Sequence, residues 1–185
     1  MNWLIASDLH GSAYYCERLL ERFAAEGADR IILLGDVLYH GPRNDLPRDY
    51  NPKRVCALLN EYRDRILCVR GNCEAEVDQV VLDFPCLAEY ALLPVPGREQ
   101  NIIFITHGHV FNEKHLPPLC SGDILLNGHF HVPRNTEYAD YTYMNPGSLS
   151  LPKNGSPHSY MTLKDGEFLW KDIDGSTFRA EEYFY

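Results

Sequence analysis

The chain has 185 residues, 45% of them hydrophobic and 23% charged, so it is long enough to bury a substantial core without disulfides. Its net charge of −9, with the basic residues scattered, argues against bulk electrostatic binding of nucleic acid and leaves room for a small anionic substrate. No stretch resembles a signal peptide or the roughly 20 apolar residues of a membrane span, so we expect one cytoplasmic domain over residues 1–185 with no membrane attachment.

The first part of the chain alternates short apolar runs with helical patterns. Apolar residues from Cys16 to Ala24 fall at helical spacing and Gly27 suits the end of that helix. Asn51 and Pro52 are typical of the start of another helix. The predicted elements are, in chain order, a strand at residues 3–6, a helix at 16–24, a strand at 31–34, a helix at 51–62, a strand at 66–69 and a short helix near 77–81.

From residue 87 onward the pattern changes to strands with brief connections. The turn KDGE, between two apolar runs, is a hairpin signal. The predicted strands lie at 87–95, 102–105, 124–126, 141–144, 159–163 and 168–173, with a last one near Phe178.

Residues 39–53, which contain three prolines and a glycine, form the longest irregular stretch of this pattern. A connection of this length is rarely without a role. The sequence leaves two interpretations open, a solvated surface loop or a lip over an active site.

Five apolar strands each end at a small residue or glycine and then deliver aspartate, histidine or asparagine, in the stretches ASDLHG, LGDVLYHG, VRGNCE, ITHGH and LNGHFH. One such stretch alone indicates no more than a strand leading into a turn, with its aspartate capping the next helix. In open α/β sheets, ligands bind outside the carboxyl ends of the strands, so five stretches of this kind can converge on one site. The candidate residues are Asp8, His10, Asp36, Asn72, His107, His129 and His131.

These residue types indicate a metal centre. Carboxylate, imidazole and amide donors together suit Mn²⁺, Fe or Zn²⁺. The six cysteines show no CxxC pair, which argues against a thiolate zinc site or a disulfide framework. Seven donors are more than one tetrahedral ion can bind, so the simplest interpretation is two metal ions that share one carboxylate.

The ordered motifs DLHG, GDVLYHG, GNCE, THGH and GHFH, over residues 8–131, resemble those of the calcineurin-like metallophosphoesterases. With NPGSLSLPK after them, the chain is similar to the YfcE-type group of small bacterial phosphodiesterases. The resemblance implies an α/β fold, a four-layer αββα sandwich of two mixed β-sheets flanked by helices, with the metal pair at one edge. It implies phosphodiester hydrolysis by a hydroxide held between two divalent ions, most simply Mn²⁺, and it is compatible with a homodimer.

Carried over position by position, the resemblance gives the first metal Asp8, His10 and His131, with Asp36 as the bridge. The second metal is completed by Asn72, His107 and His129. The candidate catalytic residues are Asp36, Asn72, Cys73 and His109. Two interpretations remain open for His40 and His109: each either contacts the metal ligands or the substrate, or is a surface residue. Many relatives have histidine where Cys73 stands, and the cysteine puts efficient protonation of poor leaving groups in doubt.

Three other functions remain open at this point. A phosphomonoesterase or a pyrophosphate-cleaving hydrolase would use the same ligands, and fold alone does not separate them. A scaffold protein on the same fold, similar to the retromer subunit, would not need the ligands, yet every ligand position is filled. The expected partner is a small phosphoester, with selectivity set by the loops at 39–53 and 109–122.

Overall fold

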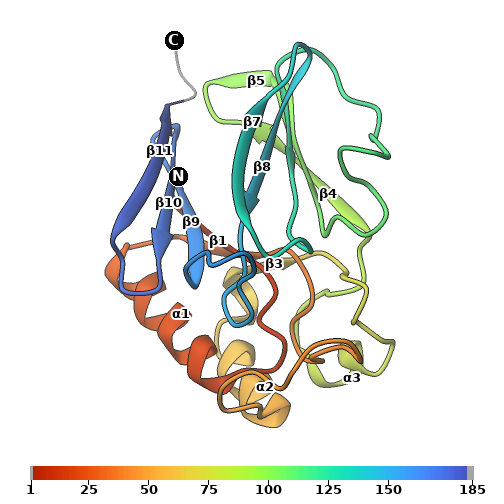
Figure 1. Ribbon diagram of the computed structural model, residues 1–185, viewed down its shortest axis with the longest axis vertical. Helices are drawn as coiled ribbons and strands as arrows, with labels where there is room; N and C mark the ends of the chain where they lie inside the picture. The colour runs from red at the N-terminus through yellow and green to blue at the C-terminus, as the bar shows by residue number, and fades with distance from the viewer. Residues whose placement is uncertain (1, 183–185) are drawn as a thin grey trace.

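The computed structural model describes residues 2–182, whose helices and strands follow the alternation of the sequence (Figure 1). The elements are β1 (Asn2–Ala6), α1 (Ala13–Ala25), β2 (Arg30–Leu33), α2 (Pro52–Asn60), the 3₁₀ turn η1 (Arg63–Arg65), β3 (Ile66–Cys68), α3 (Asp78–Val81), β4 (Tyr90–Val95), β5 (Arg98–Thr106), β6 (Asp123–Leu126), β7 (Pro133–Glu137), β8 (Tyr141–Pro146), β9 (Ser159–Lys164), β10 (Glu167–Asp172) and β11 (Thr177–Glu182).

A six-stranded mixed sheet, in the order β11-β10-β9-β1-β2-β3, forms the first layer. Its centre is parallel from β1 to β3, and every residue of β1 is buried. Helix α1 begins at Ser12, whose hydroxyl accepts the backbone N–H of Tyr15, and α2 begins with Pro52 in its first turn, as the sequence predicts. The apolar faces of both helices pack on this sheet, on the side away from β5 and β8 (Figure 1).

A five-stranded mixed sheet, in the order β4-β5-β6-β8-β7, packs its inner face against the first sheet. Ile103, Ile105 and Leu126 on this sheet meet Ile5 and Ile32 in one buried core. The outer face is covered by residues of the 107–122 segment, which contains turns in place of a helix. The predicted fold class of two mixed sheets with helices is confirmed, with α1 and α2 as the outer layer on the first sheet and turns as the outer layer on the second.

Three differences between the predicted and observed strands exceed two residues. β4 begins at Tyr90, later than the predicted 87, and β5 begins at Arg98, earlier than the predicted 102. β7, with the sequence PRNTE, was not predicted at all, because it lacks an apolar alternation. It pairs only with β8 at the edge of its sheet, where polar side chains and a first-position proline are tolerated.

The carboxyl ends of β1, β2, β3, β5 and β6 all lead into the five polar stretches, which therefore meet where the two sheets adjoin. Within residues 2–182 no helix has the length and apolar character needed to span a membrane.

Candidate metal centre

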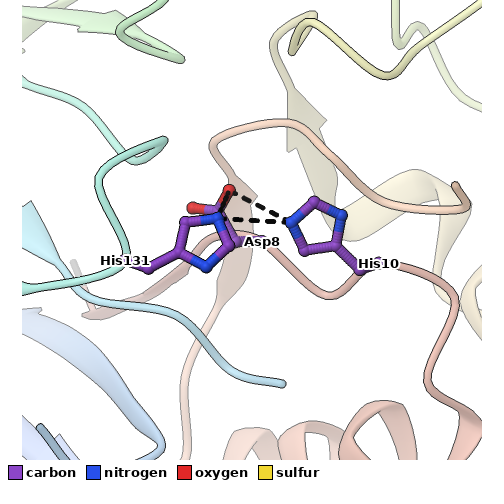
Figure 2. A group of neighbouring side chains, drawn as sticks. All are labelled: Asp8, His10 and His131. Carbon is purple, nitrogen blue, oxygen red and sulfur yellow. Dashed lines mark hydrogen bonds and ion pairs between the residues drawn. The ribbon is translucent and has the colours of Figure 1, made fainter. Parts of the chain in front are cut away.

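All seven predicted ligands converge at this edge, in two groups joined by Asp36. We call Asp8, His10 and His131 the inner cluster, and Asn72, His107 and His129 the outer cluster. In the inner cluster Asp8 Oδ1 lies 3.1 Å from His131 Nε2 and 3.6 Å from His10 Nε2. Figure 2 shows a ring nitrogen of His10 facing both His131 and the Asp8 carboxylate. The Nε2 atoms of the two histidines lie 3.4 Å apart. All three side chains are buried.

The carboxylate of Asp8 offers one oxygen to a cation. Its Oδ2 accepts hydrogen bonds from Ser7 Oγ at 2.6 Å and from the backbone N–H of His129 at 3.0 Å. Its Oδ1 is buried and has no hydrogen-bond partner among the residues that the structure describes. Since buried polar atoms are nearly always hydrogen-bonded, this oxygen, placed between two imidazole nitrogens, fits a divalent metal ion.

Backbone carbonyls fix three of the imidazoles in a ligating orientation. The Nδ1 atoms of His10, His107 and His131 lie 2.8, 2.6 and 2.6 Å from the carbonyl oxygens of Tyr39, Leu34 and Leu151. When Nδ1–H donates to a carbonyl, Nε2 carries the lone pair and faces the cluster. This is the usual arrangement around metal-bound histidine.

The outer cluster is more open. His107 Nε2 lies 3.2 Å from Asn72 Oδ1 and 3.2 Å from His129 Nδ1, so His129 presents the opposite ring nitrogen from the other histidines. His107 is buried, His129 is half-buried and Asn72 is exposed. The Asn72 amide donates from Nδ2 to Cys73 Sγ at 3.3 Å, which leaves Oδ1 toward the cluster.

Asp36 lies between the clusters. Its Oδ2 is 3.8 Å from His10 Nε2 and 3.5 Å from His107 Nε2, while its Oδ1 accepts the backbone N–H of Cys73 at 2.9 Å. One oxygen of this carboxylate therefore faces both groups of nitrogen donors, and the other is used to hold the turn after β3.

The acids and imidazoles of the two clusters shift one another's pKa values. Burial alone would raise the pKa of Asp8, but the close imidazoles of His10 and His131 outweigh it and hold the pKa well below its usual range. Burial would lower the pKa of His107, but Asp36 and Asp8 outweigh it and raise the pKa to about 9. Burial and the nearby His107 lower the pKa of His129 to about 4. The acids thus stabilise positive charge between the clusters, which protons or metal ions can supply.

Five of the seven predicted ligands have a left-handed backbone, with φ of 57° at Asp8, 50° at His10, 53° at Asp36, 65° at His129 and 60° at His131. Each such residue costs about 1–3 kcal/mol and persists only where its surroundings fix it, typically at functional sites. Two predicted glycines make room: a Cβ on Gly71 would lie 2.1 Å from Asp36 Oδ1, and one on Gly35 would lie 2.5 Å from the Gly71 nitrogen.

Sequence reasoning missed Glu74, which is 4% exposed and ties two of the ligand turns together. Its carboxylate accepts backbone N–H groups from Asp36 at 2.8 Å, Val37 at 2.7 Å and Gly71 at 2.5 Å. Burial, followed by the charge of Asp36, raises the pKa of Glu74 to about 7. The only sequence signal was its place in GNCE, at the end of β3.

The stretch NPGSLSLPK supports the inner cluster from behind. Ser148 and Ser150 donate from Oγ to the Asp8 carbonyl oxygen at 2.9 and 3.0 Å. Leu151, in the same stretch, provides the carbonyl that orients His131. These contacts hold the strained backbone of Asp8 in place.

The remaining predicted residues lie around the clusters. The half-buried Cys73 groups with His10 and Asp36, and a Cβ on Gly41 would lie 3.2 Å from its Sγ, so segment 39–53 passes beside the thiol. Burial and then Asp36 raise the pKa of Cys73. His109 lies at the rim, with its ring 5.4 Å from that of His107. The ring of His40 packs edge-on against Tyr39 and Tyr50.

A cavity of about 420 Å³ opens beside Asp36, Asn72, His129 and His131. Arg43 and Asn44 also line it, so segment 39–53 forms part of its wall. Of the two interpretations of this segment, the structure therefore favours a lip over the site.

Comparisons of the sequence with known proteins found a family and several relatives. A family model described as "Calcineurin-like phosphoesterase superfamily domain" matches residues 1–166. The chain is 46% identical over 163 residues to phosphodiesterase YfcE of Escherichia coli strain K12, covering 88% of this chain and 87% of the relative. It is 26% identical over 170 residues to a probable metallophosphoesterase, YsnB of Bacillus subtilis strain 168, covering 88% and 83%.

Solved structures match the fold over the full chain. The structure of Yfce, described as a phosphoesterase from E. coli, matches with a TM-score of 0.94 and 41% identity, covering 100% of both chains. An archaeal phosphodiesterase matches with a TM-score of 0.62 and 18% identity, covering 98% of this chain and 99% of the other. Vps29 of Entamoeba histolytica, complexed with Zn, matches at 0.59 and 16%, covering 100% of both. The last two likenesses concern the fold alone.

Proposed function

The chain belongs to the calcineurin-like phosphoesterase superfamily, and on that premise we propose that it is a metal-dependent phosphodiesterase with a dinuclear centre. The inner cluster would hold one divalent ion and the outer cluster the other, with Asp36 as the bridge. The mixed carboxylate, imidazole and amide donors suit Mn²⁺, with Fe or Zn²⁺ as alternatives.

The observation that carries this proposal is the position of Asp36 Oδ2, 3.8 Å from a nitrogen of the inner cluster and 3.5 Å from one of the outer cluster. A carboxylate oxygen shared by two sets of donors is suited to a pair of ions about 3.5–4 Å apart. The buried Asp8 Oδ1, which lacks a hydrogen-bond partner in the described part of the chain, supports a cation at the inner cluster.

When bound, such a pair of ions supplies Lewis acidity toward the phosphoryl oxygens and makes hydroxide available near neutral pH. The chain's own contribution is preorganisation. Three backbone carbonyls keep Nε2 of His10, His107 and His131 directed at the clusters, and Glu74 holds the turn that carries Asp36. Because the outer cluster is the more exposed one and borders the cavity, the ester would enter from that side.

Cys73 and His109 are the protic side chains beside the outer cluster, and we propose that the departing oxygen meets them. A thiol is a poorer general acid than imidazole near neutral pH, where it titrates at about 8.5 when unperturbed. With cysteine next to Asn72, the enzyme should favour esters whose leaving groups depart as stable anions.

The alternatives are ranked by two observations. The diesterase function is supported by 46% identity to a protein named phosphodiesterase YfcE, which favours it over a phosphomonoesterase or a pyrophosphate-cleaving hydrolase. Vps29 shares the fold, but a scaffold on this fold has no need of seven converged donors and an unpartnered buried carboxylate oxygen.

The test is hydrolysis of bis-p-nitrophenyl phosphate and p-nitrophenyl phosphate by the full chain after chelation and after reloading with Mn²⁺. We expect activity to disappear with the chelator, to return with Mn²⁺, and to show the higher kcat/KM for the diester. Full turnover by the chelated protein would contradict the metal centre. A higher kcat/KM for the monoester, with the same metal, would favour the monoesterase.

A further inference from the structure

The cavity beside the two clusters is lined by four side chains to which the proposed metal chemistry gives no role: Arg43, Asn44, Phe130 and Lys153. They come from three separate segments, the 39–53 lip, the GHFH turn and the turn after β8. The volume of about 420 Å³ is in the range of small-molecule sites, and because Asp36, His129 and His131 also line it, bound ions and the phosphoryl group would fill only the part next to them.

Two of these residues, Arg43 and Lys153, carry a positive charge. Across residues 2–182, the structure gives the side chains of Arg43 and Lys153 no hydrogen bond and no ion pair. By contrast, Arg18, Arg54 and Arg134 each pair with a glutamate. In a chain with a net charge of −9, two unpaired cations that face one cavity favour an anionic ligand there.

Both cations are attached to fixed backbone. The N–H of Lys153 donates to the carbonyl of His131 at 3.1 Å, so its position follows that of the inner cluster. The side chain of Asn44, next to Arg43, donates to the His40 carbonyl at 2.7 Å, a hydrogen bond within segment 39–53. The backbone from which each cation extends is therefore held beside the cavity.

Phe130 supplies a planar apolar surface in the same cavity. It lies between His129 and His131, both left-handed, and its N–H donates to the Gly128 carbonyl at 2.7 Å in a tight turn. Its ring stands 72° to the His129 ring, with the centroids 5.2 Å apart, and the residue is 44% exposed. The turn holds the ring at the cavity wall, where an aromatic base could stack on it.

Resting on the proposed phosphodiesterase function, we propose that this cavity is a subsite for the part of the substrate that lies beyond the scissile phosphoryl group. Phe130 stacks on a planar base there, and Arg43 and Lys153 bind a second anionic group. Nucleotides carry a planar ring and a phosphate in one unit of this size. The substrate class is therefore a nucleotide phosphodiester with an additional terminal phosphate.

The first experiment measures binding to the full-length, Mn²⁺-loaded protein by titration calorimetry. The probes are thymidine 3′,5′-bisphosphate, thymidine 5′-monophosphate and 2-deoxyribose 5-phosphate. If the base stacks on Phe130, the Phe130→Ala variant should bind the monophosphate over the sugar phosphate with a preference in affinity that is at least about fivefold smaller. Phe130→Trp should keep the preference of the wild type. Lys153→Ala and Arg43→Ala should each reduce the preference for the bisphosphate at least about threefold.

Matched controls exist elsewhere in the chain. Phe178 on β11 is 45% exposed, close to the value for Phe130, and Lys164 is an exposed cation at the end of β9. Phe178→Ala and Lys164→Ala should leave both preferences unchanged. A wild-type protein that binds all three probes equally, or cavity variants that behave like these controls, would overturn the subsite.

The second experiment compares kcat/KM for the dinucleotides TpT and pTpT, with bis-p-nitrophenyl phosphate measured on the same preparations. The terminal phosphate should raise kcat/KM at least about threefold through KM, and Lys153→Ala should remove this gain. Activity on bis-p-nitrophenyl phosphate without any pTpT preference would contradict the subsite alone. Loss of all diesterase activity with the binding preferences intact would contradict the proposed function alone.

Discussion

Two acids, the buried Asp8 and the half-buried Glu26, are stabilised in different ways. Glu26 accepts hydrogen bonds from Lys171 Nζ and Tyr160 OH, each at 2.7 Å, so fixed partners match its charge; we call these three residues the Glu26 cluster. Asp8 keeps one carboxylate oxygen without a hydrogen-bond partner in the described part of the chain. The first arrangement stabilises the fold, and the second leaves a ligand position open.

The backbone shows the same difference. Glu26 ends α1 in an ordinary helical conformation, with φ of −75°. Asp8, at the end of β1, is left-handed, as are four other predicted ligands. Conformational strain is thus concentrated where a cation would be bound, which is consistent with function taking precedence over stability at this edge.

The largest effect that separates the two regions is expected for Asp36→Asn. Loss of one charge between the clusters would weaken the binding of both ions at once. We therefore expect kcat/KM to fall more than about 100-fold, which exceeds the typical effect of mutating a residue that only orients a ligand. The measurement is hydrolysis of bis-p-nitrophenyl phosphate with saturating Mn²⁺.

The matched control for this change is Glu26→Gln, an equally small acid-to-amide substitution away from the predicted ligands. Its kcat/KM should stay within about twofold of the wild-type value, because an ion pair away from the site affects stability and not the reaction. An Asp36→Asn enzyme as active as this control would remove Asp36 from the bridge.

The next largest difference between the two regions is expected in metal binding. It is measured through the stability of the protein and needs no turnover. Mn²⁺ at 100 times its Kd should raise the free energy of unfolding by about 2.7 kcal/mol. For a chain of this size, this corresponds to a Tm increase of about 5–10 °C. Asp8→Asn should lose most of this increase, while Glu26→Gln should keep it in full. An undiminished Mn²⁺ effect in Asp8→Asn would place the ion elsewhere.

A smaller effect is expected for Cys73→His, beside the outer cluster. An imidazole there can protonate a departing oxygen, so kcat/KM for alkyl phosphodiesters should rise about tenfold more than for nitrophenyl esters, within the range of general acid catalysis. Cys120→His, at an exposed cysteine, serves as the control. If Cys73 only packs beneath the site, a graded series of aryl and alkyl esters will give parallel slopes for both proteins.

The fold could be predicted where burial determines the sequence pattern. β1, β2 and β6 are buried and read as apolar runs, so their ends also located Asp8, Asp36 and His129. β7 was missed because an edge strand needs only backbone pairing, which PRNTE provides without any periodic signal. The amino half of β5, REQN, is polar for a related reason, since much of it faces solvent in the hairpin with β4.

The metal ligands of the site could be predicted from the sequence, but the residues that hold those ligands in place could not. Seven donors follow strand ends, and that repetition is visible in the chain. Glu74 contacts backbone N–H groups of Asp36 and Val37, 38 and 37 residues away, and only the pairing of β2 with β3 brings them together. Likewise, the serines behind Asp8 lie more than 100 residues from it in sequence. Contacts of this kind depend on topology, which spacing does not encode.

The smallest expected effect concerns the Glu26 cluster itself and its response to acid. Burial alone would raise the pKa of Glu26, but hydrogen bonds from Lys171 and Tyr160 outweigh it and lower the pKa below the usual 4.5. A lowered folded pKa means that the ion pair contributes fully above pH 4.5 and is lost as the pH falls through the folded value. Glu26→Gln should therefore cost about 1 kcal/mol near pH 7, and the difference from the wild type should shrink below pH 4.5. Urea denaturation of the metal-free proteins across this pH range tests it, and a difference that stays constant into acid would show that Glu26 acts through packing instead of charge.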